Sequence, residues 1–143
     1  MTPQQLAEAC AAAMWAEDRA SAGLGMRITR IAPGEAELTM VVEDRMVNGH
    51  GICHGGFLFA LADSAFAFAC NSFNRRAVAQ SNTITYLRPA RLGDALTAAA
   101  VQTALAGRSG ITDVVVTDQD GREIAVFRGL SRSIEGHLVE QAP

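Results

Sequence analysis

A long apolar run in the middle of this chain constrains its fold more than any other feature. From Phe57 to Cys70 the sequence reads FLFALADSAFAFAC, in which Asp63 and Ser64 carry the only polar side chains. A helix that is hydrophobic on every face lies inside a protein rather than on its surface. The run therefore predicts a central helix, from about residue 55 to residue 72, around which the rest of the chain folds.

Asp63 stands in this run without a cationic side chain beside it. A lone carboxylate loses hydration in apolar surroundings, which is costly unless another group solvates it. Burial of this kind raises the pKa of a carboxyl group toward values that are useful in acid–base chemistry. We therefore treat Asp63 as a candidate catalytic residue. The structural alternative is that it hydrogen-bonds a backbone group or lies in a subunit interface.

The residues before the helix, His54-Gly55-Gly56, favour the functional interpretation. Two glycines where a loop becomes a helix let another backbone or a ligand approach closely. The N–H groups of the first helical turn have no partner within the helix, and the helix dipole places positive charge behind them. This arrangement can bind an anion or stabilise the oxyanion that forms on a carbonyl group.

Composition and charge argue against several classes of protein. The 143 residues suffice for a single domain over residues 1–143, and no linker divides them. A net charge of −3 gives no electrostatic case for binding nucleic acid. The three cysteines lack metal-ligand spacing, and Cys53 beside His54 has no third partner for nucleophilic chemistry. We see neither a signal peptide nor a run of transmembrane length, so we expect a cytoplasmic protein that does not bind membranes.

Turn signals divide the rest of the chain into predicted elements. A first helix is expected over residues 3–20, with Thr2 as its N-cap and Pro3 in its first turn. Strands are expected over residues 26–31, 35–43, 78–87, 95–105, 111–118 and 123–134, and a frayed tail over residues 135–143. One buried helix with consecutive antiparallel strands is an α+β architecture, in which a curled sheet wraps around the helix.

Four motifs follow one another along the chain: Asn48-Gly49-x-Gly51-x-x-His54-Gly55-Gly56, Phe57-x-x-x-Leu61-x-Asp63, Ile84-x-Tyr86-x-Arg88-Pro89 and Gly93-Asp94. Together they resemble the hotdog-fold acyl-CoA thioesterases, and most of all the phenylacetate-degradation, or PaaI-like, branch. The resemblance extends from about Met14 to Arg132 without large gaps. It implies the hotdog fold and a hydrolase that cleaves an acyl-CoA thioester to a free acid and CoA, with neither a metal nor a bound cofactor.

The resemblance also implies a role for each matching residue. Gly55 would offer its backbone N–H to the carbonyl oxygen, Asp63 would act as general base or nucleophile, and Asn48 would hold the carbonyl or the water. His54, the fourth candidate catalytic residue, would fix the turn or contact the substrate directly. Related enzymes also use a hydroxyl on the strand after the helix, and Ser81 is displaced from that position.

Several residues are candidates for contacts with CoA. Its phosphates favour edges that are rich in arginine. Gly56, Arg88, Arg91 and Arg108 are the candidate substrate and CoA contacts, with Arg75 and Arg76 as further possibilities. The alternative for each arginine is a solvated surface charge.

The resemblance favours a small aromatic acyl group, such as phenylacetyl or hydroxyphenylacetyl, and hence a role in phenylacetate catabolism. Five aromatic side chains either line a compact pocket or form ordinary core: Phe57, Phe59, Phe66, Phe68 and Tyr86. Two other functions stay open. One is a hotdog hydratase or dehydratase that pairs His54 with Asp63, and the other is a non-catalytic acyl-CoA-binding module.

Helix geometry predicts an active site that is shared between subunits. Asp63 lies eight residues after Gly55, which is about 12 Å along the axis at a rise of about 1.5 Å per residue. One thioester carbonyl cannot contact both groups of the same helix. A second helix packed antiparallel across a two-fold axis would place its Asp63 opposite the first Gly55. We therefore expect a homodimer as the active unit and, by the resemblance, a homotetramer.

Overall fold

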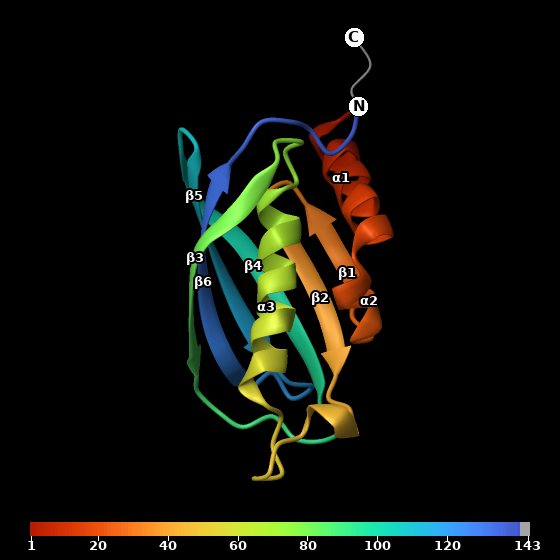
Figure 1. Ribbon diagram of the computed structural model, residues 1–143, viewed down its shortest axis with the longest axis vertical. Helices are drawn as coiled ribbons and strands as arrows, with labels where there is room; N and C mark the ends of the chain where they lie inside the picture. Colours follow the sequence, from red (N-terminus) through yellow and green to blue (C-terminus); the bar gives the residue numbers. More distant parts are fainter. Residues whose placement is uncertain (141–143) are drawn as a thin grey trace.

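The computed structural model describes residues 1–140 and shows a sheet curled around one helix (Figure 1). Six strands form a single sheet in the order β1-β2-β4-β5-β6-β3, and every neighbouring pair is antiparallel. The strands are β1 Arg27–Ala32, β2 Glu35–Val41, β3 Ala77–Tyr86, β4 Ala95–Ala106, β5 Ser109–Thr117 and β6 Glu123–Ser133. The helices are α1 Pro3–Glu17, α2 Arg19–Gly23 and α3 Gly55–Cys70, with a 3₁₀ turn at Asp44–Met46. All six predicted strands are present, with ends shifted by no more than two residues.

Helix α3 lies on the concave side of the sheet, as predicted (Figure 1). Leu61, Ala62 and Ala65 are fully buried, and Phe66 is almost fully buried. The helix packs against all six strands, most extensively against β2, β4 and β5. The prediction of an α+β fold with a curled antiparallel sheet around a central helix is confirmed. No helix in residues 1–140 has both the length and the apolar character needed to cross a membrane.

The sheet presents an apolar inner face to α3. In β2, Ala36, Leu38 and Met40 are buried, while the residues between them are only half-buried. Gly129 of β6 is required by a close approach: a Cβ at this position would lie 2.4 Å from the ring of Phe66. The missing side chain lets the ring pack directly on the strand, where burial of a phenylalanine contributes roughly 1.5–3 kcal/mol.

The first helix ends at Glu17, not at residue 20 as predicted. Asp18 interrupts it with extended backbone (φ −88°, ψ 91°). The Asp18 carboxylate accepts hydrogen bonds from the Ser21 N–H at 2.9 Å and from the Ser21 hydroxyl at 2.6 Å. An aspartate favours this N-cap geometry over helix continuation, so a new helix starts at Arg19. The buried Ser21 hydroxyl lies 2.8 Å from that of Ser64 and thereby ties α2 to α3.

The tail that we expected to be frayed from residue 135 makes hydrogen bonds as far as Val139, and residues 141–143 lie outside the described part of the chain. Asn74, which has left-handed backbone (φ 60°), accepts hydrogen bonds from the N–H groups of Leu138 and Val139, both at 2.9 Å. Its amide nitrogen donates to the Val139 carbonyl, also at 2.9 Å. One buried side-chain amide can satisfy several backbone groups at once, and here it holds the tail against the segment between α3 and β3.

Candidate active site

A tight loop over residues 47–53 leads into α3 and fixes the geometry of its first turn. Val47 and Cys53 form an isolated antiparallel bridge, and the His54 N–H donates to the Met46 carbonyl at 2.7 Å. His54 is the N-cap of α3, because its Nδ1 accepts a hydrogen bond from the Gly56 N–H at 2.9 Å. His54 therefore fixes the first turn of the helix through its side chain.

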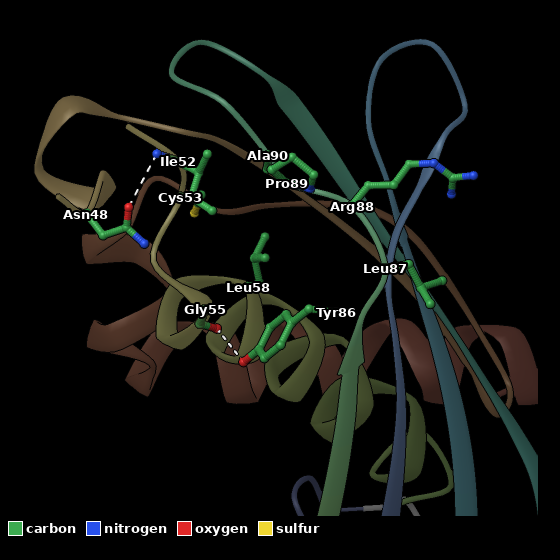
Figure 2. A pocket seen from close by; sticks show the side chains of 10 residues that line it. All are labelled: Asn48, Ile52, Cys53, Gly55, Leu58, Tyr86, Leu87, Arg88, Pro89 and Ala90. Carbon is green, nitrogen blue, oxygen red and sulfur yellow. Dashed lines mark hydrogen bonds between the residues drawn. The ribbon is translucent and has the colours of Figure 1, made fainter. Parts of the chain in front are cut away.

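Gly55 carries the first free N–H of α3. The N–H of Gly56 donates to His54, whereas the N–H of Gly55 has no acceptor among residues 1–140. The Tyr86 hydroxyl donates to the Gly55 carbonyl at 2.9 Å, which ties the end of β3 to this turn (Figure 2). A Cβ at Gly55 would lie 2.8 Å from Cζ of Tyr86. Only glycine therefore fits beside the ring while keeping its N–H available at the positive end of the helix dipole.

A cavity of about 500 Å³ opens beside Gly55. Its lining residues come from the loop over 47–53, the start of α3 and the segment after β3: Asn48, Ile52, Cys53, Gly55, Leu58, Tyr86, Leu87, Arg88, Pro89 and Ala90 (Figure 2). The size and mainly apolar lining are typical of sites for small organic ligands. The Asn48 side-chain oxygen accepts hydrogen bonds from the N–H groups of His50 and Ile52, at 2.9 and 3.4 Å. Its amide nitrogen points toward the cavity (Figure 2).

Asp63 lies half-buried in the middle of α3. The Asn82 Nδ2 of β3 donates a hydrogen bond to Asp63 Oδ1 at 3.0 Å. Burial raises the pKa of the Asp63 carboxyl above its usual value, and the hydrogen bond from Asn82 opposes this rise. A general base works best when its pKa lies near the operating pH. Asp63 is therefore better suited to accept a proton near neutral pH than an ordinary surface aspartate.

A single chain does not bring Asp63 and Gly55 together. Both belong to α3, and Asp63 lies eight residues after Gly55, which is about 12 Å along the helix axis. Asp63 is also absent from the lining of the cavity. His54 caps the same distant end of the helix, so one chain does not form the His54–Asp63 pair that a dehydratase would use.

The predicted CoA-binding arginines divide between the two ends of the sheet. Arg88 and Arg91 lie at the end that holds the cavity, and Arg88 lines it. Arg108 lies in the turn between β4 and β5, at the opposite end (Figure 1). Arg75 and Arg76 precede β3 at that same far end. Of these five arginines, one chain therefore places only Arg88 and Arg91 near the cavity.

The aromatic residues of α3 do not line the cavity. Phe66 and Phe68 are 1% and 2% exposed and belong to the core, and Phe57 and Phe59 pack against that core. Of the five aromatic residues that we considered for the pocket, only Tyr86 lines it. The phenylalanines therefore serve packing in the single chain.

Cys53 lines the cavity but is unsuited to nucleophilic chemistry. Burial raises the pKa of its thiol to about 11, which keeps it protonated near neutral pH. Its Sγ lies 3.6 Å from the backbone carbonyl oxygen of His54, with which it hydrogen-bonds. Within residues 1–140, no group of three or more His, Cys, Asp or Glu side chains is arranged to hold a metal ion.

Sequence reasoning missed Asn82, the partner of Asp63. The register of β3 shifts between Ala79 and Ser81, and this irregularity turns Ser81 toward the exposed face. A usable signal was present, because Ile84 packs against the core and alternation places the residue two before it on the same face. The hydroxyl that we considered at Ser81 does not face α3.

Sequence comparisons place the chain in a known family. Residues 50–125 match the family model described as the thioesterase superfamily. The acyl-coenzyme A thioesterase PaaI of Escherichia coli K12 is 43% identical over 91% of this chain and 93% of its own. The chain belongs to the thioesterase superfamily. The predicted class of enzyme, a thioester hydrolase, is thereby confirmed.

Solved structures of similar proteins share the fold. The structure of E. coli PaaI, from the phenylacetic acid degradation operon, matches with a TM-score of 0.93 and 42% identity over 95% of this chain and 99% of that one. The protein smu.793 of Streptococcus mutans UA159, bound to acetyl-CoA, matches with a TM-score of 0.76 and 26% identity over 78% of this chain and 90% of that one. The predicted hotdog fold is therefore confirmed.

Proposed function

We propose that this thioesterase hydrolyses a small aromatic acyl-CoA to the free acid and CoA. The observation that carries the proposal is the free N–H of Gly55 beside an apolar cavity, at the start of the helix that holds the half-buried Asp63. The relative from E. coli is named an acyl-coenzyme A thioesterase, and the protein from S. mutans is bound to acetyl-CoA. The first of these belongs to a phenylacetic acid degradation operon, which supports an aromatic acyl group.

The proposed reaction needs an oxyanion donor and an activated water. The thioester oxygen accepts a hydrogen bond from the Gly55 N–H, with the Asn48 amide nitrogen directed into the same cavity. Asp63 takes a proton from water as the water oxygen bonds to the carbonyl carbon. The C–S bond then breaks, and CoA leaves as the thiol with the proton that Asp63 held. An oxyanion donor contributes on the order of 10²–10³-fold to such a rate, and a general base about 10²–10⁴-fold.

Two subunits complete the site in this proposal. β3 ends the strand order of the sheet, so one edge of this ten-residue strand has no partner strand within residues 1–140. A long free edge favours pairing with another strand. Two β3 strands paired across a two-fold axis would set the α3 helices side by side and antiparallel, with Asp63 of one subunit opposite Gly55 of the other. Assembly of two such dimers into a tetramer stays a prediction.

We assign Arg88 and Arg91 to the phosphates of CoA, because they lie at the cavity end of the chain. Guanidinium groups form strong charge-assisted hydrogen bonds to phosphate. Gly56 is exposed and has no side chain, which leaves room for the thioester at the start of the helix. In this proposal Arg108 reaches CoA only if the second subunit brings its far end to the cavity.

A thiol-release assay over a panel of acyl-CoAs tests the proposal. We expect release of free CoA, with kcat/KM for phenylacetyl-CoA and hydroxyphenylacetyl-CoA above that for acetyl-CoA or palmitoyl-CoA. Tight binding of thioesters without thiol release would contradict hydrolysis and indicate a binding module. A higher kcat/KM for palmitoyl-CoA than for phenylacetyl-CoA would overturn the aromatic assignment alone.

A further inference from the structure

Asn82 is the polar neighbour that the chain provides for Asp63. It lies in the middle of β3 on the face that packs toward α3, opposite Gly129 of β6 in the strand register. Its Nδ2 donates to Asp63 Oδ1 at 3.0 Å. Within residues 1–140 this is the one side-chain hydrogen bond that Asp63 receives. It fixes one carboxylate oxygen and leaves the other for a further partner.

The side-chain oxygen of Asn82 receives no hydrogen bond within residues 1–140. This atom, Oδ1, is buried. On the neighbouring strand Gly129 has no side chain, and the ring of Phe66 covers that position. A buried carbonyl without a partner costs about 1–3 kcal/mol. An asparagine kept only for packing would be replaced at lower cost by an apolar residue of the same shape.

We infer that Asn82 is a positioning residue for the hydrolysis. Its amide holds the carboxylate of Asp63 in one orientation, so that the second carboxylate oxygen faces the incoming water. This inference rests on the proposed function, in which Asp63 is the general base. In this role Asn82 acts through Asp63 and makes no contact of its own with the thioester.

The hydrogen bond also sets the protonation of the base. Burial raises the pKa of Asp63, and the donor on Asn82 lowers it again because it favours the charged carboxylate. The base works only when it is ionised, so the rate rises with pH through the pKa of Asp63. Loss of the donor leaves burial unopposed, and the acid limb of the pH profile moves to higher pH.

The test compares Asn82→Leu and Asn82→Asp with Thr83→Ala, a neighbouring β3 residue whose side chain is exposed. In Asn82→Leu we expect the acid limb of kcat/KM to move to higher pH and kcat on the plateau to fall about tenfold, because misplacing a catalytic group by a fraction of an ångström is costly. In Asn82→Asp the limb moves further, since two neighbouring carboxylates do not ionise together. Thr83→Ala keeps the wild-type profile. The Tm of Asn82→Leu stays within a few degrees of wild type, which separates positioning from folding.

A direct titration decides the inference without any substrate. Carbon-13 labelling of the aspartate carboxyls, with Asp63 assigned by its loss in Asp63→Asn, gives the pKa of this group. A pKa of Asp63 that is the same in wild type, Asn82→Leu and Asn82→Asp overturns the role of Asn82. Failure of the proposed function looks different, because Asp63→Asn would then keep its thiol-release activity whatever Asn82 does.

Discussion

Asp118 is buried and Asp63 is half-buried, but the two carboxylates differ in the number of hydrogen-bond donors around them. Asp118 follows β5, and its Oδ1 accepts hydrogen bonds from the N–H groups of Asp120 and Arg122, both at 3.0 Å. Its Oδ2 accepts a third from Nε of Arg122, also at 3.0 Å. Burial alone would raise the pKa of Asp118, but these backbone and guanidinium donors together hold it below the usual value. Asp63 has one side-chain donor, Asn82, and burial raises its pKa.

Under the proposed function, this difference separates a structural carboxylate, Asp118, from a catalytic one, Asp63. The turn that contains Asp118 supplies donors to both of its oxygens, so its charge stabilises the turn. Helix α3 supplies no donor side chain to Asp63, and β3 supplies only one. A partly buried carboxylate with so few hydrogen-bond donors lowers the stability of the folded protein. The role of Asp63 in the proposed reaction explains why the chain retains a destabilising residue here.

Exchange of each aspartate for asparagine should separate the two roles. We expect Asp63→Asn to lower kcat by at least ~100-fold, on the scale of losing a general base, and to keep the wild-type Tm because asparagine has nearly the same shape. Thiol release under saturating substrate and thermal unfolding give the two readouts. Asp118→Asn is the matched control and should keep its kcat. If Asp63→Asn retained more than about a tenth of wild-type kcat, Asp63 would have no part in the chemistry.

The stability of the Asp118 turn should depend on pH. The folded-state pKa of Asp118 is lowered, so its contribution is present above the unfolded-state pKa and is lost as pH falls through the folded-state pKa. Asp118→Asn should therefore lower the Tm at neutral pH by on the order of a few degrees. The difference between the variant and wild type should shrink as the pH falls below about 4. A Tm difference that is constant with pH would show that the charge of Asp118 does not stabilise the turn.

Tyr86→Phe probes the first turn of α3 and should have a smaller effect on kcat than Asp63→Asn. The change removes the hydrogen bond to the Gly55 carbonyl but keeps the ring beside Gly55. A net hydrogen bond of about 0.5–1.5 kcal/mol corresponds to a roughly two- to tenfold loss, which we expect in kcat because the bond orients the Gly55 N–H. A loss as large as that of Asp63→Asn would mean that the hydroxyl touches the reacting atoms. An unchanged kcat would mean that it does not orient Gly55.

The central helix and the strands could be predicted because their signals are local. The apolar run of α3 and the alternation in β2 depend only on neighbours in the sequence, and both are present. The candidate site was found through Gly55 and Asp63 for the same reason, since each is unusual for its immediate context.

Features that depend on long-range packing could not be predicted. The register shift between Ala79 and Ser81 of β3 depends on the pairing of this strand with β6. The cavity depends on the Cys53 N–H, which donates to the Ala90 carbonyl at 2.8 Å and so joins two distant segments. The phenylalanines of α3 look alike in sequence, and only packing reveals that the Phe66 ring lies against Gly129 of β6.

The central claim is that Gly55 and Asn48 of one subunit act with Asp63 of another. The most direct measurement mixes two inactive variants, Asp63→Asn and Asn48→Asp. The second keeps the oxygen that accepts from His50 and Ile52 and loses only the amide donor, so the loop stays intact.

The two variants are co-expressed in equal amounts, and thiol release is compared with each variant alone. Random pairing makes half of the dimers mixed, and each mixed dimer holds one intact site, so the account predicts roughly a quarter of wild-type activity. A site contained within one chain would give no recovery, because every chain carries a lesion, and that result would contradict the account.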